Sequence, residues 1–166
     1  EPGELCIKGP NVMIGYCNQP AETAKAFTAD GYMRTGDIGV LDDQGYTRII
    51  DRKKDMMVVS GFNVYPNELE NVISMCPGVL ECAAVGVQDE RQGEAIKVYV
   101  VRSDPTLTED RVLRYCHEQL TGYKRPRFIE FRDELPKTNV GKILRRELPD
   151  KPATGDPASI SLNKIT

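Results

Sequence analysis

The 166-residue sequence contains one histidine, no tryptophan and no long apolar run. His117 lies between Cys116 and Glu118 in a helical pattern, which favours an exposed helix residue over a catalytic base. No stretch approaches the roughly 18 apolar residues of a membrane-spanning helix. The first four residues lack the basic-then-apolar order of a signal peptide, and there is no initiator methionine. We therefore expect the chain to begin inside a longer protein.

Cysteines are few, odd in number and never spaced as C-x-x-C; they are Cys6, Cys17, Cys76, Cys82 and Cys116. This pattern excludes a closed zinc site or a disulfide framework and favours a reducing cytosol. We expect each cysteine to be a small buried hydrophobe. No cluster of His, Asp or Glu has the spacing of a metal site, so no metal-binding residues are predicted.

A basic excess is also missing, since 22 basic residues face 25 acidic ones and the net charge is −3 at pH 7. Nucleic-acid binders normally neutralise phosphates with a surplus of Lys and Arg, so this class is disfavoured. There is no G-x-G, which excludes the dinucleotide fingerprint. The pair Gly141-Lys142 is followed by Ile143 and lacks the earlier glycine of a Walker loop.

Short strands and turns fill the first third of the chain. Alternation predicts strands at 4–8, 38–41 and 46–50, the last two joined through the turn residues 42–45, with a short helix at 20–27. So few short strands leave too much exposed edge for a closed core. We interpret residues 1–51 as the remnant of a larger N-terminal domain.

Five consecutive charges at 51–55 suit an exposed connection, and we place a hinge at 52–54. Residues 55–148 then show strands at 56–59, 82–87, 95–101 and 127–132 and helices at 66–75 and 108–120. This order predicts a small α+β domain. From residue 149 to 166 the composition turns to Pro, Gly, Ser and Asp, which predicts a disordered tail.

Four segments occur in a specific order: GYMRTGD at 31–37, RIIDRKKD at 48–55, SGFNVYPNELE at 60–70 and PKTNVGK at 136–142. Together they resemble the adenylate-forming superfamily, which includes acyl-CoA synthetases, luciferases and peptide-synthetase adenylation domains. Residues 1–148 are similar to the C-terminal part of bacterial long-chain fatty acid–CoA ligases. The resemblance implies that ATP, a fatty acid and CoA give acyl-CoA, AMP and pyrophosphate through an acyl-adenylate.

The resemblance also implies roles for single residues. Lys142 corresponds to the catalytic lysine that stabilises the charge formed when the carboxylate attacks the α-phosphate. Asp37 and Arg52 correspond to nucleotide-binding residues: a carboxylate for the two ribose hydroxyls and a planar fork of donors for ribose and phosphate. Without the resemblance, the three would be interpreted as a loop lysine, a turn aspartate and a solvated charge.

Lys54 falls at the family's hinge, where backbone rotation moves the small domain between two poses. Ser60, Gly61 and Phe62 correspond to the CoA tunnel, where a glycine permits close approach of the ligand; the alternative for Gly61 is an ordinary turn glycine. Arg145 and Arg146 are interpreted as surface charges. The phosphate loop, the acyl pocket and the Mg²⁺-binding acid are expected before residue 1, so this chain alone is predicted to be inactive and to bind no cofactor tightly.

Two alternatives remain: another adenylate-forming enzyme, such as an aryl–CoA ligase or a peptide-synthetase adenylation domain, or a non-catalytic binding module. The expected partners are fatty acid, ATP, CoA and the chain's own N-terminal domain, with no nucleic acid. The expected location is the cytoplasm, with peripheral contact at the inner face of the membrane as a variant, although no anchoring amphipathic helix is visible in the sequence.

Overall fold

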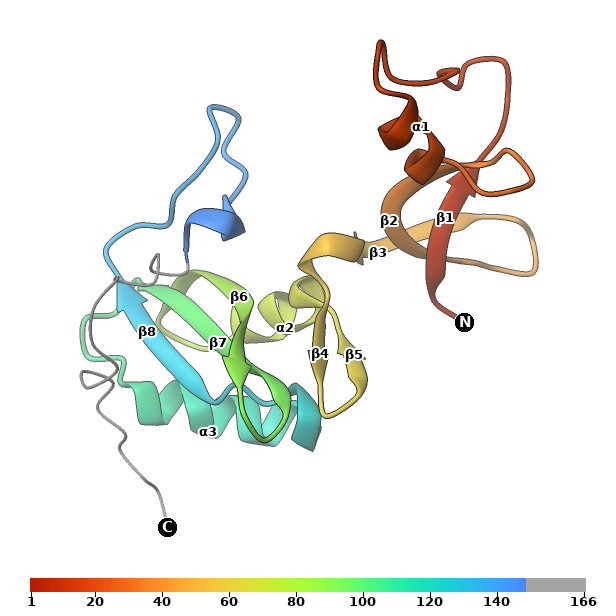
Figure 1. Cartoon of the computed structure of the whole chain (residues 1–166). Helices are drawn as coiled ribbons and strands as arrows, with labels where there is room; N and C mark the ends of the chain where they lie inside the picture. The colour runs from red at the N-terminus through yellow and green to blue at the C-terminus, as the bar shows by residue number, and fades with distance from the viewer. Residues whose placement is uncertain (149–166) are drawn as a thin grey trace.

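The computed structural model describes residues 1–148, which form two β-sheets with short helices (Figure 1). The first sheet is antiparallel and has three strands: β1 (Gly3–Ile7), β2 (Met33–Leu41) and β3 (Thr47–Arg52). They lie in the order β1-β2-β3. Helix α1, Pro20–Ala26, lies between β1 and β2 in the chain. Within residues 1–52, Ile38 is the one apolar side chain that is fully buried. This part of the chain therefore has almost no core of its own.

The second sheet has five strands: β4 (Met57–Val59), β5 (Phe62–Val64), β6 (Val79–Asp89), β7 (Gly93–Arg102) and β8 (Phe128–Arg132). Strand β7 pairs with β6 along its whole length and, on its other edge, with the parallel strand β8. Helices α2, Pro66–Ile73, and α3, Glu109–Gln119, complete the fold. The predicted α+β class is confirmed.

Strands β6 and β7 bury side chains on both faces of this second sheet, since successive side chains of a strand point to opposite sides. Cys82 and Ala84 of β6 face the cluster that includes the apolar residues of α2 and α3. Ala83 and Val85 face the other way, against Leu135, Ile143 and Leu148 from the end of the described chain. That second cluster anchors residues 133–148 on the sheet, and their hairpin projects on the side away from α3 (Figure 1).

Strand β5 is not among the predicted strands. Ser60 and Gly61 both adopt left-handed φ angles, 51° and 83°, and this turns β4 back into a tight hairpin. Strand β2 is longer than predicted and includes Asp37, so the turn-aspartate interpretation is wrong. The charged stretch 51–55 is not wholly exposed either, because Asp51 is only 3% exposed.

The remaining expectations have mixed outcomes. His117 is exposed on α3, as predicted. Cys76, Cys82 and Cys116 are buried, but Cys17 is exposed and Cys6 half-buried, so burial of every cysteine is wrong. In the described part of the chain, no helix is long and apolar enough to cross a membrane. The predicted disordered tail, 149–166, lies outside the described residues.

Candidate functional site

Asp37 and Arg52 lie side by side on the adjacent strands β2 and β3. They are directly paired in the register of β2 and β3, and Arg52 Nε lies 2.9 Å from Asp37 Oδ1. The carboxylate is one-quarter exposed and the guanidinium more than half exposed, so both groups reach solvent. Thr35 Oγ1 accepts the backbone N–H of Asp37, which orders the strand at this point. Antiparallel pairing thus joins two side chains that the sequence separates by a hairpin.

The turn between β4 and β5 carries Ser60, Gly61 and Phe62. Two consecutive left-handed residues define this turn, and a Cβ atom added at Gly61 would meet nothing within 4 Å. Ser60 N–H donates to the carbonyl of Gln92, so the turn is tied to the start of β7. Phe62 stacks on Tyr123 with ring centroids 4.6 Å apart, although it remains 55% exposed. The turn therefore offers exposed backbone beside an aromatic pair.

Lys142 lies on a second hairpin, formed by residues 136–144. Thr138 N–H donates to the Lys142 carbonyl at 2.8 Å, and Gly141 N–H donates to the Thr138 carbonyl at 2.9 Å. Gly141 has a φ of 82°, as a three-residue hairpin loop requires at its last position. Lys142 N–H also donates to Thr138 Oγ1, and the residue is exposed. The loop is thus ordered by its own backbone while presenting a lysine to solvent.

Arg145 is not a surface charge, contrary to the prediction. Its Nε and Nη2 contact the two carboxylate oxygens of Glu70 at 3.0 and 2.6 Å, and Nη2 also donates to Asn67 Oδ1 at 2.9 Å. Only a fifth of its side chain is exposed. Burial alone would lower the pKa of the guanidinium, but hydrogen bonding to Glu70 raises it above its ordinary value. Arg146, by contrast, is 80% exposed, in accord with the prediction.

Asp51 and Asn67 connect the first sheet to helix α2. Asp51 Oδ2 accepts the backbone N–H of Asn67 at 2.8 Å, and its Oδ1 accepts the N–H of Arg52. The Asn67 side chain donates to the Ile50 carbonyl. Sequence reasoning missed Asn67 and Glu70. Their i, i+3 spacing puts both on one helix face, but nothing in the sequence indicates Arg145 as the shared partner.

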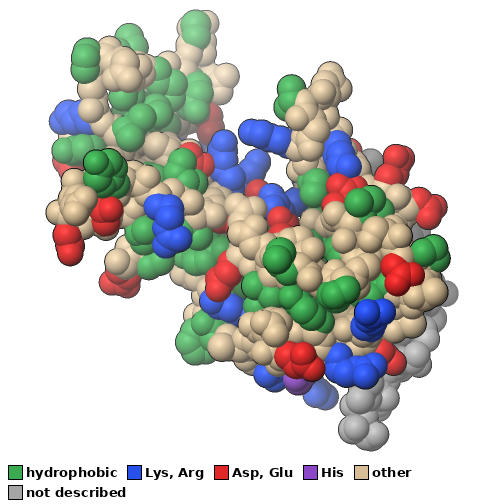
Figure 2. All heavy atoms as spheres, turned by 180° about the vertical axis from the view of Figure 1, so that it is seen from behind, with side chains coloured by type: hydrophobic (Ala, Val, Ile, Leu, Met, Phe, Trp, Pro, Cys, Tyr) green, Lys and Arg blue, Asp and Glu red, His purple; other side chains and the backbone are tan. Residues whose placement is uncertain are grey.

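The predicted residues therefore occupy three separate places: the pair on β2 and β3, the β4–β5 turn and the 136–144 hairpin. Among residues 1–148, no hydrogen bond or ion pair joins Lys142 to Asp37, Arg52 or the turn. Lys54 is exposed in the short 3₁₀ helix η1, Lys53–Asp55, which links the sheets. Seen from behind, Lys and Arg side chains gather where the two parts of the molecule approach each other (Figure 2).

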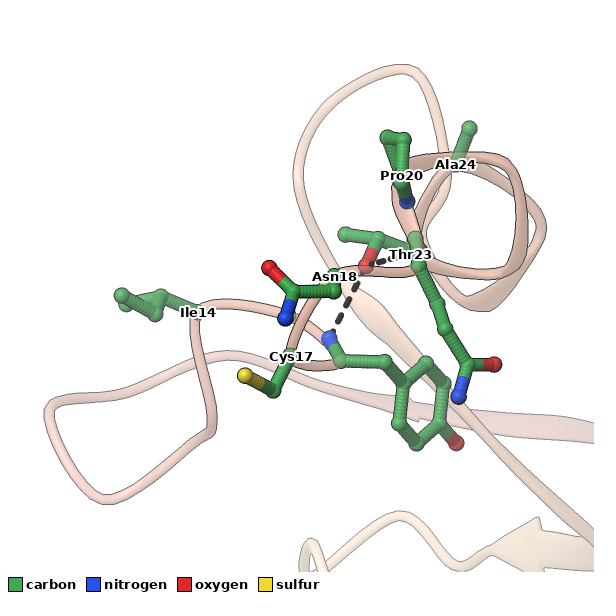
Figure 3. A pocket seen from close by; sticks show the side chains of 9 residues that line it. Ile14, Cys17, Asn18, Pro20, Thr23 and Ala24 are labelled. Atoms are coloured by element: carbon green, nitrogen blue, oxygen red, sulfur yellow. Dashed lines mark hydrogen bonds between the residues drawn. The ribbon is translucent and has the colours of Figure 1, made fainter.

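A shallow pocket beside α1 contains none of these residues. It is lined by residues 14–20 together with Thr23 and Ala24 (Figure 3). Thr23 Oγ1 accepts the Tyr16 N–H and donates to the Gln19 carbonyl, so the segment is ordered by one hydroxyl. Its side chains carry no charge, and we assign it no role. Within residues 1–148, no group of three or more His, Cys, Asp or Glu side chains is placed to hold a metal ion.

Comparison with known proteins shows which proteins this chain is similar to. Residues 68–142 match the family model described as the AMP-binding enzyme C-terminal domain. The long-chain-fatty-acid–CoA ligase of Escherichia coli O6:H1 is 59% identical over 151 residues, which are 91% of this chain and 27% of that protein. The chain thus spans about a quarter of the length of the curated relatives it matches.

Solved structures agree. ATP-bound MatB from Rhodopseudomonas palustris superposes with a TM-score of 0.83 at 39% identity, over 88% of this chain and 29% of that one. The o-succinylbenzoate CoA synthetase of Bacillus subtilis, in complex with an acyl-adenylate intermediate, has a TM-score of 0.80 at 36% identity, over 90% of this chain and 31% of that one. By these comparisons, residues 68–142 of the chain correspond to the AMP-binding enzyme C-terminal domain.

Proposed function

We propose that this chain is the C-terminal part of a long-chain fatty acid–CoA ligase. The similarity to ligases of that name supports the acyl class, and the 27% coverage supports a longer protein with a further N-terminal domain. In that protein the substrates are a fatty acid, ATP and CoA, with Mg²⁺ as the metal. The boundaries of 1–51, 52–54 and 55–148 belong to the same proposal.

The proposed reaction has two steps. A fatty-acid carboxylate oxygen attacks the α-phosphorus of ATP, and the bond to pyrophosphate breaks, giving an acyl-adenylate. The CoA thiol then loses its proton and attacks the acyl carbon, and AMP leaves. In the first step negative charge builds on oxygens of the acid and the α-phosphate together, and a cation placed there would stabilise this transition state.

Lys142 is the proposed catalytic residue for this first step. An exposed ammonium on a loop held by its own hydrogen bonds can approach a substrate bound elsewhere. A positioned cation that meets charge only as it develops lowers the barrier without stabilising the ground state equally. The ordered hairpin is the observation that carries this role, since it fixes the lysine backbone and leaves the side chain exposed.

Asp37 and Arg52 are the proposed nucleotide-binding pair. Their contact involves one carboxylate oxygen and one guanidinium nitrogen. A carboxylate can accept from both hydroxyls of a ribose, and the other guanidinium N–H groups suit a phosphate. Because the two side chains are already paired, they are preorganised and need little further ordering on binding.

Two half-reactions need two arrangements around one substrate, and we propose that rotation at Lys54 exchanges them. The exposed 3₁₀ turn at 53–55 is a short connection in which a few backbone angles can change. In one pose Lys142 meets the nucleotide; in the other, Ser60, Gly61 and Phe62 line the path of CoA. The absence of a Cβ at Gly61 supports close passage of a thin ligand.

The test is Lys142→Ala in the full-length protein, with each half-reaction assayed separately on a long-chain acid. We expect acyl-adenylate formation to fall about 10²–10³-fold, while transfer from pre-made acyl-adenylate to CoA is retained. Lys137→Ala is the matched control, because Lys137 lies on the same hairpin but pairs with Glu81. Equal rates of both half-reactions in Lys142→Ala and the unmodified protein would contradict the role of Lys142.

A further inference from the structure

The segment that follows Lys142 is fastened to helix α2 by a single side chain. Arg145 opens the 3₁₀ helix η3, Arg145–Glu147, and holds both oxygens of Glu70 through two different nitrogens. Its Nη1 also lies 3.7 Å from Asp55 Oδ2, next to the hinge. Glu70 itself is only 14% exposed, and its Oε1 accepts the Ala84 N–H of β6. This set of contacts around Arg145, called the clamp below, is therefore tied through Glu70 to strand β6.

The two arms of the Lys142 hairpin are tied to different elements. On the first arm, Lys137 Nζ lies 2.7 Å from Glu81 Oε2 on β6, in an exposed ion pair. On the second arm the tie is Arg145, and the arms meet where Leu144 N–H donates to the Pro136 carbonyl at 2.8 Å. Exposed ion pairs contribute little, whereas a half-buried bidentate pair holds geometry well. Arg145 is thus the stronger of the two ties.

The same clamp reaches the strand that carries Arg52. Arg145 donates to Asn67 Oδ1, while the amide group of Asn67 donates to the Ile50 carbonyl at 3.2 Å. Asp51, immediately before Arg52, accepts the Asn67 N–H. A continuous polar path therefore runs from the Lys142 segment, through α2, to the end of β3.

We propose that Arg145 is a positioning residue for Lys142. Its guanidinium group, bound to Glu70 and Asn67, sets the position of the 136–144 hairpin relative to the hinge and β3. This inference rests on the proposed function for its catalytic consequence. A lysine at 145 would keep the charge but would lack the planar fork that serves three oxygens at once. Displacing a reacting group by about 1 Å can cost about 10²-fold in rate.

Hydrogen exchange of the 166-residue chain tests the anchoring without any assay of activity. In Arg145→Met, we expect the N–H groups of Thr138, Gly141 and Leu144, which close the hairpin, to exchange about tenfold faster or more. Amides in the centre of β7 should keep their protection. Arg146→Met, which removes the neighbouring exposed charge, should change neither set. Unchanged hairpin protection in Arg145→Met overturns the proposal.

Half-reaction assays of the full-length protein test the consequence. We expect Arg145→Met to slow acyl-adenylate formation about 10–100-fold, with transfer from pre-made acyl-adenylate preserved. Arg145→Lys should recover only part of the loss. In a double-mutant cycle, Arg145→Met combined with Glu70→Gln should lose little more than either variant alone, because both act through one contact.

The outcomes separate the two proposals. A loosened hairpin with adenylation unchanged, or an equal loss of both half-reactions, overturns the positioning role. If the unmodified full-length protein forms no acyl-adenylate, the proposed function fails and the role toward Lys142 fails with it. Hydrogen exchange of Arg145→Met then still shows whether Arg145 anchors the hairpin.

Discussion

The carboxylate of Asp51 accepts the backbone N–H of Asn67 at 2.8 Å, so a residue at the end of β3 caps the first turn of α2. The helix needs this, because its own N-cap residue, Tyr65, provides no side-chain hydrogen bond. Asp51 is 3% exposed, and both of its oxygens accept backbone N–H groups. A carboxylate at this place satisfies an otherwise unpaired donor and interacts favourably with the helix dipole.

Removing that cap should destabilise the chain. We expect Asp51→Ala to lower the free energy of unfolding by about 1–2 kcal/mol, the usual effect of deleting a helix cap. Urea unfolding followed by circular dichroism measures the change. Asp43→Ala, in the exposed turn between β2 and β3, is the control and should have little effect. Equal stability of the two variants would contradict the capping role.

Gly61 in the β4–β5 turn and Gly122 at the start of the 3₁₀ helix η2, Gly122–Lys124, place opposite demands on the backbone. Gly61 has a φ of 83°, and Gly61→Ala should cost about 1–2 kcal/mol through backbone strain alone, since the space around it is open. Gly122 is the matched control: it also has open space but no positive φ, so Gly122→Ala should be neutral or stabilising by about 0.4–1 kcal/mol. Thermal unfolding of both variants compares them, and a similar loss in each would show that conformation is not the cause.

Thiol labelling should divide the cysteines into two classes. Burial raises the pKa of Cys82 and of Cys116 to about 12, so at about pH 8 roughly one thiol in 10⁴ is the reactive thiolate. Exposed Cys17 should react first in the folded chain, and Cys17→Ser should remove that fast phase. Mass spectrometry after peptide digestion measures the order. Fast modification of Cys82 or Cys116 without denaturant would contradict the packing.

The pairing of Glu4 should make stability fall in acid. A hydrogen bond from Lys53 at 2.8 Å, with a second from Arg34, holds the pKa of the Glu4 carboxyl below its ordinary value, against the opposing effect of burial. Because the folded state favours the ionised form, the stabilisation is present above the ordinary glutamate pKa. It is lost as pH falls through the lowered value.

Glu4→Gln isolates this contribution. The variant should be less stable than the unmodified chain at about pH 6, and the difference should shrink toward zero at about pH 3. Urea unfolding followed by tyrosine fluorescence measures both chains. A difference that stays constant over this range would mean that the carboxylate charge does not contribute.

Local sequence patterns were sufficient to predict most of the helices and strands. Apolar periodicity located both α2 and α3, and Thr108 Oγ1 accepts the Arg111 N–H at the start of α3. Strand β5 was missed because Phe-Asn-Val is too short to show alternation, and its hairpin depends on a serine in the left-handed region. Serine is not a typical residue there, so the sequence carries no strong signal for it.

The sequence by itself determined the α+β class, the order of elements and the motifs that carry Asp37, Arg52, Gly61 and Lys142, because periodicity, turn residues and motif spacing are local properties of the chain. Only the tertiary structure decided which charges meet. Strand register set Asp37 opposite Arg52, and packing of residues 133–148 on the sheet brought Arg145 to Glu70 and Asn67. A charge's partner depends on how distant segments pack, so Arg145 and Arg146, identical neighbours in sequence, have different surroundings.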